Sequence, residues 1–213
     1  MTTFSDDELI EKCKDFTMTS RERQIQTLYS IQYIVDNNVE GDIIEIGVWK
    51  GGCVMLMLGK LLQLGITDRR VHLYDTFTGM TEPGKLDVDP HGNHASVHWD
   101  TGSCYCSYDA VYNNIQSVGY PMDLISFHVG DIRNVDVSTV PEKIAVLRLD
   151  NDWHELYKFE LPIFEPRVTV NGIITIDDYG WWSGCKIAVD EYNKDKDVQY
   201  VPIANETVYW LKK

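Results

Sequence analysis

The sequence has few basic residues, and this shortage excludes several classes of partner. Its 213 residues include 19 lysines and arginines against 33 aspartates and glutamates, a formal net charge of −14. A protein that binds nucleic acid needs clustered lysine and arginine opposite the phosphates, and an anionic membrane surface attracts the same residues. We therefore expect no nucleic acid and no membrane as a partner.

The sequence also lacks long apolar runs, and we expect no signal peptide from its first residues. No run approaches the roughly 20 apolar residues that cross a bilayer. The start, MTTFSDDELIEKCKDF, lacks the basic and then apolar segments of a signal peptide. The five cysteines are odd in number and scattered, which is typical of a reduced chain. We expect a cytoplasmic location.

Strand-like apolar runs and helical segments alternate along the chain, the order typical of an α/β protein. The length suits one domain over 1–213, and no internal repeat or linker divides it. Within it we expect an N-terminal helical segment over 1–38, where Ile25, Leu28, Ile31 and Val35 have helical spacing. The predicted strands are 42–49, 71–77, 123–131, 144–150, 172–179, 198–204 and 207–213. The predicted helices are 23–38, 54–65, 108–119, 152–168 (interrupted by Pro162) and 182–196.

The last two predicted strands identify the kind of sheet. Only Asn205 and Glu206 join them, and this link is too short for a parallel crossover, so the two strands are antiparallel neighbours. A dinucleotide-binding Rossmann sheet is typically all parallel. We therefore predict a class I (Rossmann-like) methyltransferase fold: a seven-stranded, mostly parallel sheet with an antiparallel final strand and helices on both faces.

Carboxylates follow two of the buried strands. Asp150 ends IAVLRLD, and Asp177 and Asp178 follow GIITI. Ligands of such sheets bind beyond the carboxyl ends of the strands, where these acids would meet. Like charges that close repel unless a cation lies among them, and hard oxygen ligands favour Mg²⁺ or another hard divalent cation. The alternative is that the acids are solvated strand ends or helix N-caps.

The first strand leads into a glycine-containing turn, EIGVWKGG. Gly47 permits a sharp turn after the strand, and Gly51 and Gly52 permit a ligand to approach the backbone. The pattern is neither the GxGxxG of dinucleotide folds nor the GxxxxGK[ST] of phosphate loops. Glu45 would repel a pyrophosphate but could hold an amino-acid ammonium.

Two further acids follow the next strands. Asp75, at the end of the second strand, can accept both hydroxyls of a ribose, and Asp131 follows the third strand, where an adenine ring would lie. An acid for an ammonium, an acid for a ribose and no phosphate site together describe S-adenosylmethionine (SAM).

These motifs resemble a known family. GDIIEIGVWKGG, YDTFTGM, LRLDND and GIITIDDYG followed by CKIAVDEY are similar to the macrocin O-methyltransferase (TylF/MycF-like) family from about Arg21 to the C-terminus. Its members use SAM and Mg²⁺ to methylate hydroxyls, typically on sugars of natural products. The resemblance implies a small-molecule or glycan acceptor. It also implies a cofactor site of Glu45, Gly47, Val48, Gly51, Gly52, Asp75, Thr76, Phe77, Gly130, Asp131 and Ile132, and a metal site of Asp150, Asp177 and Asp178.

The sequence departs from the family at Trp153 and His154, where an aliphatic–tyrosine pair is frequent, and 84–107 does not align. A general base must lie near the acceptor hydroxyl, and the candidates are Asp150, Asp152 and His154. The aperiodic segment 79–107 is expected to be a substrate lid. Zinc is a weaker alternative there, because the spacing matches no usual zinc pattern; the ligands would be His91, His94, His98, Cys104 and Cys106.

Two other functions remain open at this point. One is a non-catalytic SAM- or metabolite-binding partner subunit, against which the intact acids at both sites argue. The other is a nucleotide-dependent reductase on a related fold, against which the absent GxGxxG argues. The acceptor and a homo-oligomeric state are not determined by the sequence.

Overall fold

The strands form one sheet of seven in a computed structural model that describes residues 4–213. The first three residues of the expected helical segment 1–38 lie outside the described residues. The strand order is β3-β2-β1-β4-β5-β7-β6, and β7 alone runs antiparallel to its neighbours, β5 and β6, as predicted. The strands are β1 (Asp42–Ile46), β2 (Val71–Asp75), β3 (Ile125–Val129), β4 (Ile144–Leu149), β5 (Val168–Ile176), β6 (Val201–Ile203) and β7 (Thr207–Leu211).

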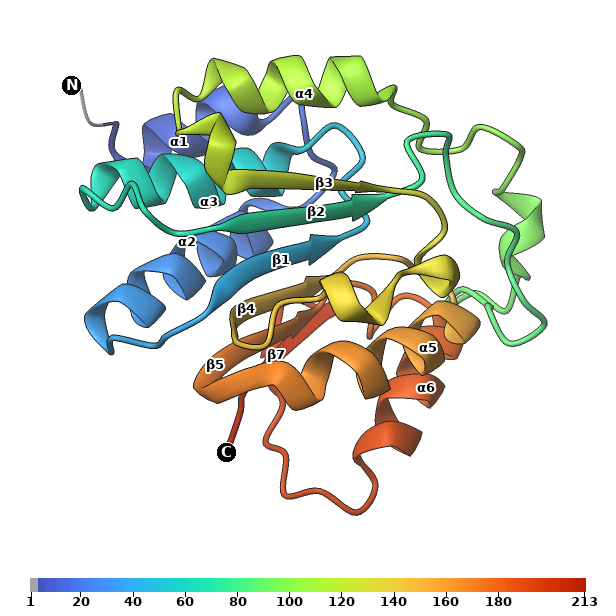
Figure 1. Ribbon diagram of the computed structural model, residues 1–213. Helices are drawn as coiled ribbons and strands as arrows, with labels where there is room; N and C mark the ends of the chain where they lie inside the picture. The colour runs from blue at the N-terminus through green and yellow to red at the C-terminus, as the bar shows by residue number, and fades with distance from the viewer. Residues whose placement is uncertain (1–3) are drawn as a thin grey trace.

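Helices cover both faces of the sheet (Figure 1). The helices α1 to α4 lie on one face, and α5 and α6 lie on the other. Pro162 does not interrupt α5, because the helix continues through it for two residues before a 3₁₀ turn. The helices are α1 (Asp6–Cys13), α2 (Arg21–Asp36), α3 (Gly52–Gln63), α4 (Tyr108–Ser117), α5 (His154–Phe164) and α6 (Ser183–Asn193).

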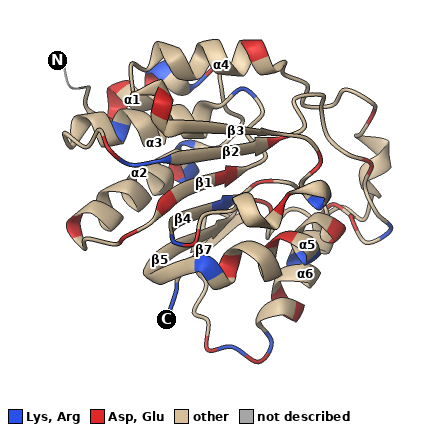
Figure 2. Cartoon of the chain, viewed as in Figure 1, with Lys and Arg blue, Asp and Glu red and all other residues tan. Residues whose placement is uncertain are grey.

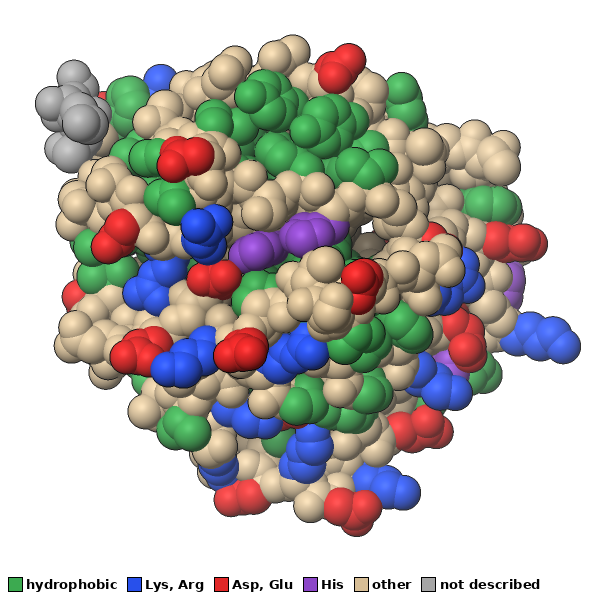
Figure 3. All heavy atoms as spheres, viewed as in Figure 1, with side chains coloured by type: hydrophobic (Ala, Val, Ile, Leu, Met, Phe, Trp, Pro, Cys, Tyr) green, Lys and Arg blue, Asp and Glu red, His purple; other side chains and the backbone are tan. Residues whose placement is uncertain are grey.

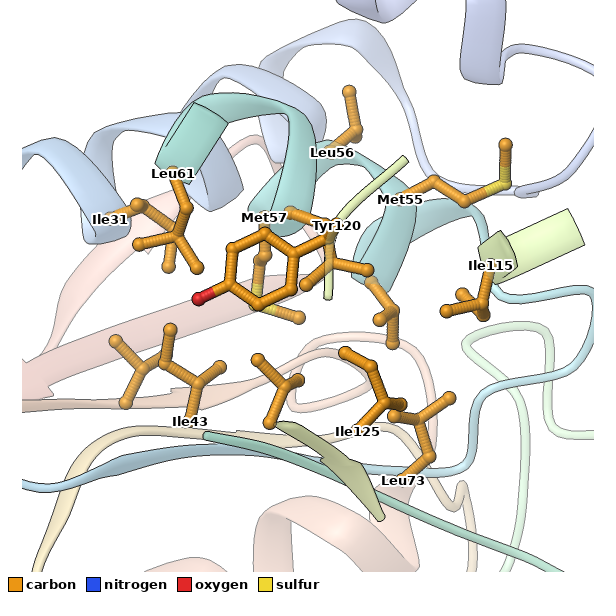
Figure 4. Packing of buried hydrophobic residues seen from close by; sticks show 14 of the residues in the cluster. Ile31, Ile43, Met55, Leu56, Met57, Leu61, Leu73, Ile115, Tyr120 and Ile125 are labelled. Atoms are coloured by element: carbon orange, nitrogen blue, oxygen red, sulfur yellow. The ribbon is translucent and has the colours of Figure 1, made fainter. Parts of the chain in front are cut away.

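Alternating side chains of the strands form two cores. Ile43 of β1 packs with the α1–α4 layer, and Ile44 packs with the α5–α6 layer. In the first core, side chains from α2, α3 and α4 meet those of the first three strands (Figure 4). No helix among residues 4–213 combines the length and apolar character needed to cross a membrane.

Helix α2 packs on the sheet through a partly polar face. Leu28 and Ile31 are buried as predicted, but Ile25 is 48% exposed, so the predicted apolar stripe is wrong at that position. Gln26 is buried instead and donates to Ser30 Oγ at 2.8 Å and to Thr175 Oγ1 of β5 at 3.1 Å. Polar groups of the sheet on this side explain the polar helix face.

The connection from β3 to β4, residues 130–143, contains only two 3₁₀ turns, Ile132–Asn134 and Val137–Thr139.

The ring of His128 stacks on Tyr74 at 4.0 Å, and its Nε2 lies 3.1 Å from His72 Nδ1. His72 Nε2 lies 2.9 Å from Asp42 Oδ2. Histidine side chains gather on the face in view in Figure 3.

Segment 79–107 is folded against α5 and α6. The Asp87 carboxylate is fully buried and accepts the N–H groups of His154, at 2.9 Å, and Gly84, at 2.7 Å. A Cβ on Gly184 of α6 would lie 1.9 Å from Asp87 Oδ1, so only glycine fits beneath this anchor. These contacts therefore hold the segment in a fixed position beside the carboxyl ends of β4 and β5.

Candidate active site

A cavity lies beyond the carboxyl ends of the central parallel strands, where the sequence places the site. Most of the predicted residues line it: Glu45, Gly47, Val48, Gly52, Asp75, Thr76, Gly130, Asp131, Ile132, Asp150, Asp152, Asp177 and Asp178. Gly51, Phe77 and His154 do not line it. Cys104 and residues 79–81 bring the expected lid segment to its edge.

Two glycines of the first turn are explained by close contacts between chain segments. Gly47 has φ +82°, and a Cβ there would lie 2.0 Å from the carbonyl oxygen of Asp150. Gly52 starts α3 and donates its N–H to Phe16 O at 3.0 Å, where a Cβ would lie 2.5 Å away. Both glycines therefore pack backbone against backbone and close the cavity floor.

Asp75 holds the turn after β1 in place. Its Oδ2 accepts the N–H groups of Val48 at 2.7 Å and Trp49 at 3.1 Å, and its Oδ1 accepts the N–H of Phe77 at 2.8 Å. The carboxylate thus organises the loop whose backbone lines the cavity. Phe77 itself is buried in the first core, where its ring meets Tyr108 edge to face.

Asp131 caps the turn after β3. Its carboxylate accepts the Arg133 N–H at 2.9 Å and forms a bidentate pair with the Arg133 guanidinium, which holds the pKa of Asp131 below its usual value. Gly130 and Ile132 flank it on the cavity wall. This acid is therefore already paired with a cation.

Glu45 lies at the floor of the cavity and is 1% exposed. Its Oε1 accepts from Arg148 Nη1 at 3.0 Å, while its Oε2 is buried with no hydrogen-bond partner among the described residues. Burial raises the pKa of Glu45 to about 8, against the lowering effect of the Arg148 charge. An unsatisfied buried carboxylate oxygen favours a cationic or hydrogen-bond-donating ligand.

The three acids of the predicted metal site meet in the structure. Asp150, Asp177 and Asp178 each offer an oxygen within 4.8 Å of the others. Asp177 is paired on both oxygens, with Arg148 Nη2 at 2.6 Å and Arg23 Nη1 at 2.8 Å. Asp150 Oδ2 also accepts from Arg148, at 2.6 Å.

Negative charge at the cavity exceeds the positive charge that faces it. Seven acids line the cavity, and besides Asp75 and Asp131 there are five buried or half-buried acids near two arginines, Arg23 and Arg148. Burial, with the charges of the neighbouring acids, raises the pKa of Asp152 to about 8 and that of Asp178 well above its usual value. A bound cation would relieve this repulsion. The five acids are Glu45, Asp150, Asp152, Asp177 and Asp178.

The three candidate bases have different positions. Asp150 and Asp152 line the cavity, and Trp182 Nε1 donates to Asp152 Oδ1 at 2.8 Å. The backbone N–H of His154 donates to Asp87, and its ring Nδ1 lies 3.0 Å from Glu155 Oε1. Because His154 starts α5 and does not face the cavity, the structure brings only the two aspartates to the site.

The sequence analysis did not identify the two arginines or the segment between α1 and α2. Arg148 interrupts the apolar strand β4, and this charge within a buried run was the available signal. Arg23 and residues 16–19 line the cavity without a local pattern that indicates it. Two histidines of segment 79–107 have side-chain partners within it: His94 Nε2 lies 2.8 Å from Gly84 O, and His98 Nε2 lies 3.3 Å from Asp89 Oδ2.

Comparison with known proteins gives consistent matches over nearly the whole chain. Residues 11–212 match the macrocin-O-methyltransferase (TylF) family. The chain is 30% identical over 198 residues to demethyldecarbamoylnovobiocin O-methyltransferase of Streptomyces niveus, covering 92% of this chain and 75% of the relative. It is 28% identical over 204 residues to mycinamicin III 3''-O-methyltransferase of Micromonospora griseorubida, covering 92% and 78%.

Solved structures agree with these matches. The O-methyltransferase NovP superposes with a TM-score of 0.82 at 29% identity, covering 93% of this chain and 82% of that chain. The calicheamicin methyltransferase CalS11 superposes with a TM-score of 0.67 at 19% identity, covering 97% and 90%, which supports the fold alone.

Proposed function

Because the chain belongs to the macrocin O-methyltransferase (TylF) family, we propose that it methylates a sugar hydroxyl of a small molecule with the help of a divalent cation. The chain is a SAM-dependent O-methyltransferase of class I fold. The name of one relative, from Streptomyces olivaceus, specifies a rhamnosyl group and its 4'-oxygen; that relative is 31% identical over 178 residues, 83% of this chain and 67% of the relative.

The cavity fits the methionine end of SAM at Glu45. The free, buried Oε2 of Glu45 is an acceptor for the ammonium group, and the backbone of Gly47 lines the same cavity. Asp75 and Thr76 would lie along the ribose, and Gly130 to Ile132 along the adenine, since all line the same cavity. No cluster of basic side chains that could hold a pyrophosphate is among the lining residues.

The acid cluster fits a hard divalent cation. Asp150, Asp177 and Asp178 supply three carboxylates at one point, the ligand type that Mg²⁺ prefers. The ion pairs of Arg23 and Arg148 occupy both oxygens of Asp177, so Asp150 and Asp178 offer the less engaged oxygens. A cation bound there would orient a vicinal diol and lower the pKa of the attacking hydroxyl.

Asp152 is the residue we assign as the general base. Trp182 fixes its Oδ1, and Oδ2 accepts no hydrogen bond from the described residues, so this oxygen is the one available to an acceptor hydroxyl. Trp153, Leu156 and Met80 line the same cavity, and their apolar surfaces would limit the access of water to it. The methyl donor and acceptor would thus be held in line, from which much of the rate derives.

The observation on which this proposal depends is that an unsatisfied Glu45 and a three-carboxylate cluster share one cavity. The test is incubation of the protein with SAM, Mg²⁺ and glycosides that carry vicinal diols, alongside analogues that lack one hydroxyl, followed by mass spectrometry. We expect a mass gain of one methyl group on diol glycosides only. Methylation of the deoxy analogues at equal rates would contradict the role of the diol.

The alternative of a nucleotide-dependent reductase predicts the opposite ligand preference. At 100 times its dissociation constant a ligand raises the free energy of unfolding by ~2.7 kcal/mol, which is readily seen as a melting shift. We expect SAM and S-adenosylhomocysteine to stabilise the protein and NAD to have no effect. Stabilisation by NAD alone would overturn the proposed cofactor site.

A further inference from the structure

Arg148 lies at the centre of the charged groups in the cavity floor. It is on β4, in register with Glu45 of β1 on one side and Thr175 of β5 on the other, and it is 2% exposed. Figure 2 shows acidic and basic segments side by side near the ends of β1 and β4. A guanidinium in a central strand, buried by helices on both faces, must have carboxylate partners to be stable there.

The guanidinium contacts acids of both proposed sites. Its Nη1 donates to Glu45 Oε1 at 3.0 Å and to Asp150 Oδ2 at 2.6 Å, and its Nη2 donates to Asp177 Oδ1 at 2.6 Å. The Glu45 side chain has no other hydrogen-bond partner among the described residues, where its Oε2 has none. The direction in which Glu45 points therefore depends on Arg148.

We propose that Arg148 is a positioning residue for the amino-acid end of the cofactor, because it holds Glu45 Oε1 and thereby presents Oε2 to the ammonium group. The inference rests on the proposed placing of that ammonium at Glu45. A planar guanidinium has donors in fixed directions and can hold acids on two sides at once, whereas the single ammonium of a lysine cannot span the same positions. Replacing Arg148 by lysine should therefore conserve the charge but lose the positioning of Glu45.

Arg23 provides a matched control in the same cavity. It is also nearly buried and also pairs with Asp177, at 2.8 Å, but its second partner is Glu206, at 3.2 Å, and it does not contact Glu45. Replacing either arginine by lysine leaves the net charge unchanged. Only the change at Arg148 disturbs the support of Glu45.

The experiment measures the affinity of two probes by calorimetry in the presence of EDTA. S-adenosylhomocysteine carries the amino-acid end, and 5'-methylthioadenosine lacks it. We expect Arg148→Lys to weaken the affinity for S-adenosylhomocysteine about tenfold or more, which is the scale for losing a hydrogen bond to a charged group. The affinity for 5'-methylthioadenosine should stay within about twofold of the wild-type value. Arg23→Lys should leave the affinities for both probes within about twofold of the wild-type values.

Glu45→Gln separates this inference from the proposed function. If Glu45→Gln leaves S-adenosylhomocysteine affinity unchanged, the placing of the ammonium is overturned. If Glu45→Gln weakens it but Arg148→Lys does not, only the role of Arg148 is overturned. If Arg148→Lys weakens the binding of both probes equally, the effect is a general structural one, and the positioning role of Arg148 is also overturned. In the Glu45→Gln background, Arg148→Lys should have no further effect. Melting curves verify the fold, and Arg148→Gln replaces Arg148→Lys if the latter does not fold.

Discussion

Replacing Asp178 by asparagine should stabilise the cation-free protein and abolish its response to Mg²⁺. Asp178 is 8% exposed, and its one hydrogen-bond donor among the described residues is the Tyr157 hydroxyl, at 3.4 Å. Neither arginine of the cavity contacts it. Burial and the charges of Asp152 and Asp150 therefore raise its pKa well above the usual value.

The magnitude follows from linkage. The stability that comes from holding Asp178 protonated is present below its usual pKa of about 3.8 and is lost as the pH rises toward its folded pKa. In that range the free energy of unfolding of the wild type falls by ~1.4 kcal/mol per pH unit relative to a variant without the group. Asp178→Asn, neutral and of equal size, should therefore become progressively more stable than the wild type between pH 5 and pH 7.

The assay is chemical unfolding over this pH range, with EDTA and with 10 mM Mg²⁺. The wild type should gain stability from Mg²⁺, and Asp178→Asn should gain little. Asp131→Asn is the control, because Asp131 lines the same cavity but is paired with Arg133 and lies outside the cluster. The reasoning is refuted if Asp178→Asn follows the wild type at every pH and shows the same Mg²⁺ effect.

Three further predictions concern groups outside the cluster. Asp75→Asn replaces one of the two oxygens that accept from the Val48 and Phe77 N–H groups by an NH₂ donor, so S-adenosylhomocysteine binding should weaken by about 1–3 kcal/mol in calorimetry; unchanged affinity would contradict this. Burial raises the pKa of Glu160 to about 8, so this group should lower wild-type stability as pH rises from 4.5 to 8, and Glu160→Gln should show a shallower slope in unfolding curves. Burial and His72 lower the pKa of His128 to about 4, so stability is lost as pH falls from 6.5 to 4; a His128→Phe variant with the same acid slope would refute this.

The sheet could be predicted because its strands are short apolar runs with distinct ends. β4 and β5 end at the acids the sequence indicates, and the short link of residues 204–206 between β6 and β7 requires the antiparallel pairing of β7. Parallel neighbours bring their carboxyl ends to one edge, so Asp150 and Asp177 meet without any knowledge of side-chain geometry. Local pattern and topology together were sufficient for this part of the site.

The ion pairs of the cavity could not be predicted, because they depend on register between distant segments. Arg148 faces Glu45 only because β1 and β4 pair at those positions, and Arg23 reaches Asp177 only because α2 crosses β5. The position of His154 depends on Asp87, which holds the start of α5 from a segment with no periodic pattern. Such contacts are set by tertiary packing rather than by spacing along the chain.

The most direct test of the account is the initial rate of methyl transfer from SAM to a vicinal-diol glycoside as free Mg²⁺ is varied from an EDTA-buffered zero to millimolar concentrations. The account predicts a rate that rises from near zero and saturates, and that stays near zero in Asp178→Asn, while S-adenosylhomocysteine affinity changes little. A rate that is the same in EDTA and in Mg²⁺, and is retained in Asp178→Asn, would contradict it.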